Sequence, residues 1–140
     1  MPAEPHAEPP VREMRLVVTA TDFAEAVHFY RDVLGLPERA AYSSPDGQVV
    51  ILEAGRATLE IADPAQAEFI DRVEVGRRVA GHIRIAFEVG DSTEMADQLV
   101  SGGATLVAGA TVTPWQTVNA RLEAPAGLQL TLFSGAPLAG

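Results

Sequence analysis

Six residues at alternating positions of short predicted strands have side chains suited to binding a small molecule. They are Arg15, Glu60, His82, Arg84, Thr131 and Phe133. Successive side chains of a strand point to opposite faces of a sheet, so all six fall opposite the apolar side chains of their strands. Ligand pockets combine apolar walls with a few placed polar groups, and this set provides both. An ordinary solvent-facing sheet surface is the alternative interpretation.

The two arginines of this set need a partner if they are buried. Arg15 and Arg84 would each require a hydrogen-bonded carboxylate, because burying an unpaired charge is costly, and Glu60 could serve both. Neighbouring cations lower the pKa of a carboxylate and make it a weaker base. The set therefore indicates orientation of a ligand more than acid–base catalysis.

Composition and motifs exclude several other chemistries. The 140 residues contain no cysteine, which excludes disulfides, thiolate zinc sites and cysteine nucleophiles, and they contain no phosphate-binding loop or serine hydrolase motif. Ten basic and 19 acidic residues give a net charge of -9, which disfavours nucleic acid and anionic membranes as partners. No apolar run reaches the roughly 18 residues of a membrane span and no signal peptide is evident, so a cytoplasmic location is expected.

The predicted elements form two similar halves behind a proline-rich arm, residues 1–13, which is expected to be extended or disordered. In the first half one strand precedes a helix that Asp22 caps and Gly35 ends, and three strands follow. These strands are expected at Met14–Ala20, Glu38–Tyr42, Gln48–Glu53 and Ala57–Ile61. A helical linker is predicted over residues 63–80, with Asp63 as its N-cap.

The second half repeats this order. At an offset of 69 residues Arg84 matches Arg15, and Asp91 matches the helix cap Asp22. Such a match indicates an internal duplication, and two unrelated strand-to-helix turns are the alternative. After the second helix, strands are expected at Thr105–Val107, Val118–Glu123 and Leu128–Phe133.

Hydrophobic periodicity assigns the core-facing residues of the second half. The inward residues are Ile83, Ile85, Phe87 and Val89 on the first strand, Met95, Ala96, Leu99 and Val100 on the helix, and Leu128, Leu130 and Leu132 on the last strand. In each half the helix must cover one face of the sheet of that half, because its apolar stripe has nowhere else to go. We therefore predict one α+β domain over residues 14–140. It consists of two βαβββ modules, 14–62 and 81–134, whose curved mixed sheets form a cleft.

Three segments carry a resemblance to a known family: TDFAEAVHFYRDVLGL (Thr21–Leu36), the GHIRIAFEVGD strand and the TPWQTVNARLEAPAGLQLTLF stretch. Together they resemble the vicinal oxygen chelate superfamily, which includes glyoxalase I, extradiol dioxygenases, fosfomycin-resistance enzymes and bleomycin resistance proteins. The resemblance covers residues 14–134. It implies the tandem βαβββ fold, a small-molecule ligand, and modules paired within or between chains, so that a homodimer is expected.

Enzymes of this superfamily hold a divalent metal with His or Glu residues from four strands. The resemblance places Arg15, Glu60, Arg84 and Thr131 at these positions, and of these only Glu60 is a metal-ligand type. Arginine has no lone pair to give a metal and its charge repels one. A strand shifted by two residues would instead place His82 at a ligand position. The expectation is a protein without a metal cofactor, and the alternative is Fe, Mn, Ni or Zn held by Glu60 and His82.

Aromatic side chains give the remaining signal. The resemblance implies that Trp115 lies at the mouth of the pocket, where it could stack on a ligand with Phe133, Tyr42 and Phe69. Ordinary core or interface aromatics are the alternative. The leading hypothesis is a metal-free protein of the bleomycin resistance type that sequesters an amphipathic or aromatic ligand. A metal-dependent lyase, isomerase or dioxygenase of the same superfamily is the alternative.

Overall fold

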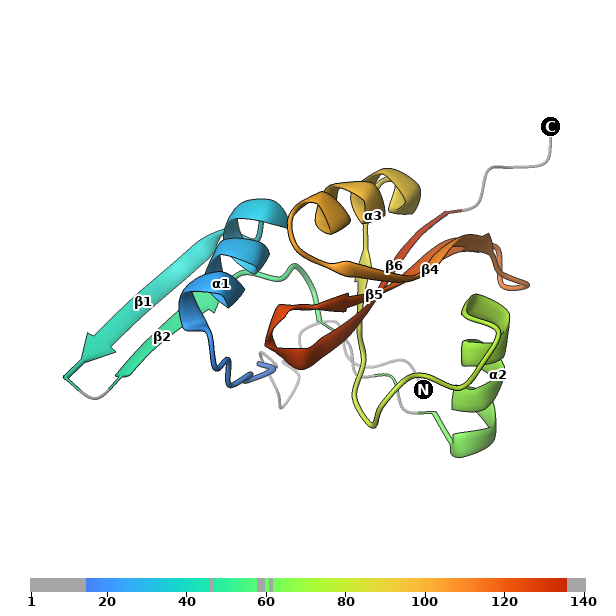
Figure 1. Cartoon of the computed structure of the whole chain (residues 1–140), viewed down its shortest axis with the longest axis horizontal. Coiled ribbons are helices and arrows are strands. Elements are labelled where there is room, and N and C mark those ends of the chain that lie inside the picture. Colours follow the sequence, from blue (N-terminus) through green and yellow to red (C-terminus); the bar gives the residue numbers. More distant parts are fainter. Residues whose placement is uncertain (1–14, 46, 58–59, 61, 136–140) are drawn as a thin grey trace, which may run out of the picture.

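The chain forms two separate sheets in the computed structural model, which describes residues 15–45, 47–57, 60 and 62–135 (Figure 1). The smaller sheet is an antiparallel hairpin of β1 (Glu38–Ser44) and β2 (Gly47–Leu52). The larger sheet contains β3 (Ile85–Glu88), β4 (Thr105–Val112), β5 (Thr117–Ala124) and β6 (Leu128–Gly135). Its strand order is β3-β6-β5-β4, and β3 is parallel to β6 while the other neighbours are antiparallel.

The helices begin where the sequence predicts them, each at an aspartate. The side chains of Asp22, Asp63 and Asp91 accept hydrogen bonds of 2.8–3.0 Å from the backbone N–H three residues on. These bonds satisfy donors that the first turn of a helix leaves without an intrahelical partner. The helical segments are α1 (Phe23–Val27), which continues into the π-helical segment η1 (His28–Val33), α2 (Pro64–Glu74), α3 (Ser92–Ser101) and the short 3-10 segment η2 (Pro125–Gly127).

The second half of the chain has the predicted order of strand, helix and three strands. Helix α3 packs on one face of the four-stranded sheet, where Leu99 meets Leu122, Leu130 and Leu132, all fully buried. Ile85, Phe87 and Val89 pack against this cluster from β3 and the residue after it. The alternation of β3 and β6 is therefore as predicted, and the mixed α+β fold class is confirmed.

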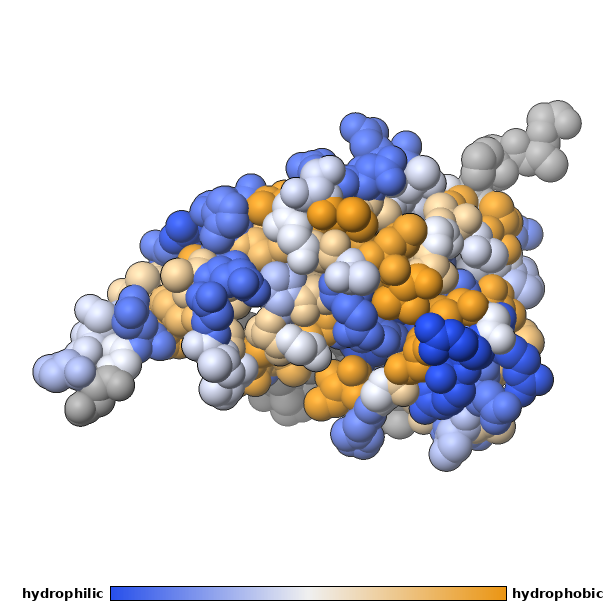
Figure 2. Space-filling view, viewed as in Figure 1, coloured by the Kyte–Doolittle hydropathy of each residue, from blue (hydrophilic) through white to orange (hydrophobic). Residues whose placement is uncertain are grey.

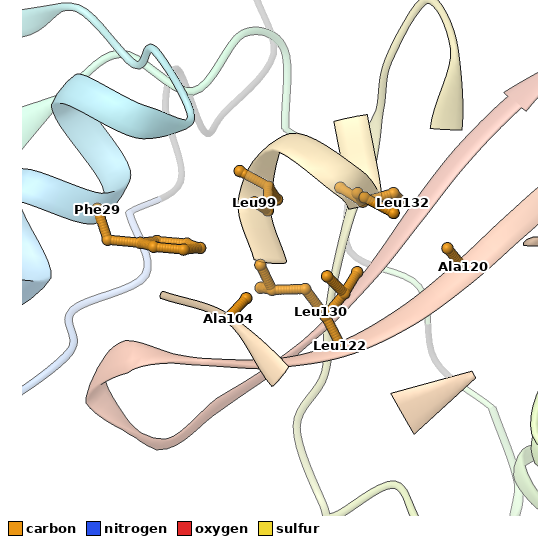
Figure 3. Close-up of a cluster of buried hydrophobic side chains, with 8 residues drawn as sticks. Phe29, Leu99, Ala104, Ala120, Leu122, Leu130 and Leu132 are labelled. Carbon is orange, nitrogen blue, oxygen red and sulfur yellow. The ribbon is translucent and has the colours of Figure 1, made fainter. Parts of the chain in front are cut away.

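The helix of the first half completes the same core. Phe29 of η1 points toward Leu99 of α3 and Ala104, and its ring is 1% exposed (Figure 3). The neighbouring Tyr30 donates a 2.8 Å hydrogen bond from its hydroxyl to the backbone carbonyl of Pro125 in η2. The first helix thus packs on the second half, whereas the sequence predicted that it would cover a sheet of its own half.

The predicted strand Met14–Ala20 is wrong over residues 15–20, which have no strand structure. A strand is stable only within a ladder, and neither of the described sheets includes residues 15–20. Its apolar side chains are accordingly exposed, Val17 to 85%. In the predicted strand Ala57–Ile61, neither Ala57 nor Glu60 is in a strand, and residues 58, 59 and 61 lie outside the described part, as does the predicted arm 1–13.

Two residues predicted to face the core are exposed. Ile83 is 60% exposed because β3 begins only at Ile85. Val100 is 40% exposed, whereas Ala96 and Leu99 of the same helix are buried. Val100 is rotated by about 100° from Leu99 around the helix axis, which turns it toward the solvent-facing side of α3.

Candidate functional site

The polar face of the four-stranded sheet is buried where β5 and β6 pair. Asn119 and Arg121 of β5 and Gln129 and Thr131 of β6 point away from the leucine core, yet all are buried. Helix α2 covers part of this face (Figure 1). The buried part of this face therefore differs from a solvent-facing sheet surface, the alternative interpretation of the sequence, because the linker helix α2 covers it.

Arg121 is the centre of a buried charge network. Its Nη1 donates to Asp71 Oδ1 and to Gln129 Oε1, and its Nη2 donates to Glu74 Oε1, each at 2.8 Å. Glu74 Oε2 accepts a further 2.8 Å bond from Asn119 Nδ2. A buried guanidinium is tolerated only when it is paired and hydrogen-bonded in this way. Arg121 therefore links α2 to both central strands of the sheet.

Asp71 also organises the loop that follows α2. Its Oδ2 accepts bonds from Arg78 Nη1 at 2.6 Å and from the backbone N–H groups of Val79 and Ala80 at 2.8 and 2.9 Å. Burial alone would raise the pKa of Asp71, but the hydrogen bonds from Ala80, Arg121, Val79 and Arg78 outweigh it and hold the pKa well below its ordinary range. Asp71 is therefore an anion that accepts hydrogen bonds both from the loop after α2 and from the sheet.

Arg84 and Thr131 are brought together, as two of the predicted site residues. The Arg84 guanidinium donates to the Thr131 hydroxyl from the segment just before β3. Burial lowers the pKa of Arg84, and the nearby positive charge of Arg121 lowers it further, while the charges of Glu74 and Glu60 act in the opposite direction. The polar face thus holds two neighbouring guanidinium groups.

The other predicted site residues are more dispersed. Arg15, Glu60 and His82 are exposed, and none of them lies in a strand. Phe133 is half-buried on β6, beside Glu88 of β3. The negative charge of Glu60 acts on Arg84, whose pKa it raises.

Trp115 lies in the turn between β4 and β5, as predicted. Its ring is 6.3 Å from that of Phe69 on α2, with an interplanar angle of 53°. Tilted ring pairs at such distances are favourable contacts. Both rings are exposed, so the pair forms the outer edge of the contact between α2 and the sheet.

The positions that the resemblance assigns to a metal do not fit one. Arg84, at one of these positions, has no lone pair for a metal, and its guanidinium donates a hydrogen bond to Thr131 at a second position. Within the described ranges no three His, Asp or Glu side chains are grouped as metal ligands would be.

Two hollows on the surface lie away from the predicted residues. One of about 410 Å³ is lined by Thr19, Thr21, Asp22, Glu25, Ala126 and Gly127. The other, of about 560 Å³, is lined by Arg77, Arg78, Val79, Thr105, Leu106, Val107 and Glu123. The second hollow adjoins the buried network, since Glu123 Oε1 accepts a 2.8 Å bond from Gln129 Nε2.

Sequence reasoning missed the residues that form the network. Arg121 stands between Ala120 and Leu122, and this alternation places it opposite the core, a signal that was available. Asp71 and Glu74 are three residues apart and so share one face of α2, but the same spacing occurs on solvent-facing helices. The sequence therefore contained both halves of the network without indicating that they meet.

Comparisons with known proteins agree with this architecture. A lactoylglutathione lyase from Agrobacterium tumefaciens is 25% identical, with a TM-score of 0.56 over 91% of this chain and 96% of that one. A member of the glyoxalase/bleomycin resistance protein/dioxygenase superfamily from Sphaerobacter thermophilus is 21% identical, with a TM-score of 0.56 over 84% and 91% of the two chains. A glyoxalase-related enzyme from Fulvimarina pelagi is 15% identical, with a TM-score of 0.54 over 89% of each.

Three further findings come from a search of curated proteins, the lengths of the helices and a scan against family models. A search of curated proteins gave no match. No helix in the described part of the chain is long and apolar enough to cross a membrane. The model of one family matches residues 14–132, which is most of the chain. The protein therefore belongs to the Glyoxalase/Bleomycin resistance protein/Dioxygenase superfamily.

Proposed function

We propose that this protein binds a small molecule without a metal cofactor and acts by sequestration, in the manner of the bleomycin resistance branch of its superfamily. The observation that carries the proposal is the bond between Arg84 and Thr131. It joins two of the four positions that the resemblance matches to the metal ligands of the superfamily's enzymes. A protonated guanidinium there favours an organic ligand with an acceptor group over a cation.

The surroundings of Arg84 support a ligand with a polar and an aromatic part. Arg84 and Arg121 supply charge on the sheet, and Phe133 is half-buried on the same face. Trp115 and Phe69 supply exposed aromatic surface at the edge of α2. This combination of a few polar groups with aromatic walls is typical of small-molecule sites.

An enzyme is the second candidate, favoured by one comparison. The 25% identical neighbour from Agrobacterium tumefaciens is named a lactoylglutathione lyase. In this chain a metal-dependent reaction would have to use Glu60 and His82, which are both exposed. Exposed side chains hold a metal poorly, and the positive charge of Arg84 near Glu60 opposes a cation. The binding function is therefore the better supported of the two.

Metal content separates the two candidates. The full-length, untagged protein is incubated with manganese, iron, nickel or zinc, desalted and analysed for metal per chain. We expect less than about a tenth of an equivalent, because Arg84 opposes a cation. One full equivalent that is lost in His82→Ala and kept in His28→Ala, a matched exposed histidine, would overturn the proposal in favour of the enzyme.

Ligand binding is then tested with Arg84→Ala. Emission of Trp115, the one tryptophan of the chain, is followed against anionic, neutral and cationic aromatic compounds. The variant is expected to bind the best compound at least about fivefold more weakly while keeping its circular dichroism spectrum. Arg56→Ala, in an exposed turn, is the control. An unchanged affinity in folded Arg84→Ala would overturn the proposal.

We further propose a homodimer. The β1–β2 hairpin extends away from the four-stranded sheet (Figure 1), and Tyr42 on it is 62% exposed. A two-stranded sheet is marginally stable alone, so burial against a second copy would stabilise it. Light scattering is expected to give twice the chain mass of 14.8 kDa. Tyr42→Lys is expected to shift it to one chain, and a truncation starting at Val11 tests whether residues 1–10 contribute.

A further inference from the structure

Helix α2 is attached to the sheet by two carboxylates. Asp71 and Glu74 are its buried residues, whereas its apolar residues Phe69, Ile70 and Val73 all remain at least partly exposed. A helix that covers a sheet ordinarily buries an apolar stripe. In the view of Figure 2, strongly hydrophilic residues gather over the region of α2. The attachment of this helix therefore depends mainly on charge-assisted hydrogen bonds.

The sheet side of this contact has the form of a receptor for carboxylates. Arg121 presents Nη1 to Asp71 and Nη2 to Glu74, both at 2.8 Å, and Asn119 donates to the second oxygen of Glu74. A guanidinium with a neighbouring amide is the arrangement that proteins use to recognise carboxylate ligands. Arg84 adds a second positive charge close by.

This receptor has more hydrogen-bonding capacity than α2 uses. Within the described part of the chain, Arg121 Nε and Asn119 Oδ1 are buried without a hydrogen-bond partner. Buried polar atoms are rarely left so, and each one needs an explanation. Arg121 Nε is a donor, so it could bind a carboxylate oxygen that the geometry of α2 does not supply. Asn119 Oδ1 is an acceptor, so it needs a donor such as a water molecule.

We propose that Asn119, Arg121 and Gln129, with Arg84 beside them, form a binding site for small dicarboxylates. Asp71 and Glu74 are its internal occupants, and a dicarboxylate displaces them together with α2. The inference rests on the proposed binding function and names its ligand class. Two carboxylates on a short spacer neutralise the buried guanidinium as α2 does, whereas a neutral or cationic ligand would leave Arg121 unpaired.

Fluorescence of Trp115 reports whether α2 leaves. It is the one tryptophan of the chain, and its ring contacts Phe69 of α2. The full-length protein is titrated with succinate and glutarate. Acetate, which has a single carboxylate, and 1,4-diaminobutane, which has a similar span and opposite charge, are the controls at equal ionic strength. A saturable change in emission is expected for the two dicarboxylates alone. An equal response to acetate would overturn the proposal.

Glu74→Gln tests competition between the helix and the ligand. The substitution weakens the attachment of α2 and so raises the fraction of protein in which the site is open. The apparent affinity for succinate rises with that fraction, and succinate is therefore expected to bind about tenfold more tightly. Glu68→Gln is the matched control, because Glu68 lies on the same helix and pairs with Arg72 in solvent. Its affinity is expected to stay within about twofold of wild type. Equal gains in both variants, or no succinate binding in Glu74→Gln, would overturn the proposal.

Hydrogen exchange identifies the segment that moves, and it needs no variant. The amides of Val79 and Ala80 bond to Asp71 Oδ2, so saturating succinate is expected to accelerate their exchange while the β5–β6 ladder stays protected. Unchanged exchange at these amides would place the ligand elsewhere and overturn the proposal. Arg121→Gln, if circular dichroism shows that it folds, is expected to abolish the succinate response.

The two proposals fail in different ways. An aromatic compound that binds while succinate and glutarate do not would remove the dicarboxylate site and leave the small-molecule function standing. One equivalent of bound metal that is lost in His82→Ala would overturn the metal-free function. The dicarboxylate site would then still be tested independently by the succinate titration of Glu74→Gln.

Discussion

Gly102 at the end of α3 lies directly against the side chain of Val33 in η1. A Cβ atom added at Gly102 would stand 2.3 Å from Val33 Cγ1, far inside van der Waals contact. The absence of a side chain at Gly102 therefore allows the first helix to approach α3 closely enough for Phe29 to enter the core.

Gly102→Ala is expected to lower the free energy of unfolding by about 1–3 kcal/mol, because the added methyl forces Val33 or the helix to shift. Urea denaturation followed by circular dichroism measures the loss. Gly109→Ala is the control, since a Cβ there meets nothing within 4 Å. The double variant Val33→Ala/Gly102→Ala should be less destabilised than the sum of the two single variants; additive losses would contradict the contact.

Phe29→Ala is expected to lower the free energy of unfolding by about 3–5 kcal/mol, because it removes a fully buried ring and leaves a cavity between η1 and α3. Chemical denaturation again provides the measurement. Phe69→Ala removes an exposed ring and is expected to change stability by only about 0.5 kcal/mol. Similar losses in the two variants would mean that the first helix does not complete the core.

Tyr30 is expected to make stability fall at alkaline pH. Burial raises the pKa of its hydroxyl above the ordinary value near 10, so the folded state favours the neutral form. Its contribution is therefore complete below about pH 10 and is lost as pH rises beyond that. Urea midpoints at pH 8 and 10.5 should diverge in wild type and less so in Tyr30→Phe.

The same Tyr30→Phe variant is expected to lose about 1 kcal/mol at pH 7, because the bond to Pro125 O is removed. Tyr42→Phe, at an exposed position, controls for the loss of a phenol. An identical alkaline decline in wild type and Tyr30→Phe would assign the effect to other groups.

Asp71 is expected to make stability fall in acid. Its pKa is held below the ordinary value near 3.9, so its contribution is present above about pH 4 and is lost as pH falls toward the folded pKa. Asp71→Asn should be destabilised at pH 7, by about 3–5 kcal/mol for a broken buried pair, and should show a flatter decline between pH 5 and pH 2. Asp97→Asn, on the exposed side of α3, is the control.

Local signals predicted the helices and the second sheet well. Aspartate caps and an apolar alternation act over three or four residues, and Asp22, Asp63 and Asp91 all cap as expected. The strand expected at residues 14–20 shows the limit. A β-branched run favours an extended strand, but only a neighbouring strand provides its hydrogen bonds, and the sequence does not say whether one is present.

The candidate site was predicted only in part, for a similar reason. Arg84 directly precedes β3, and Thr131 lies on β6, the parallel neighbour of β3. The alternation of apolar and polar residues in these strands places both side chains on the same face of the sheet. The contact of Asp71 with Arg121 joins residues fifty positions apart, from a helix and a sheet of different parts of the chain. No periodicity encodes such a contact, so the helix that covers the polar face was missed.

The insertion of Phe29 into the core has a consequence for the order of folding during synthesis. The side chains that surround this ring come from Leu99, Ala104 and β6, all of which leave the ribosome much later. Nascent domains fold as units once their core is complete. When the first sixty residues have left the ribosome, the apolar face of the first helix therefore still lacks the α3 and β6 side chains against which it packs. A chaperone that shields this helix until β6 is made would raise the yield of folded protein.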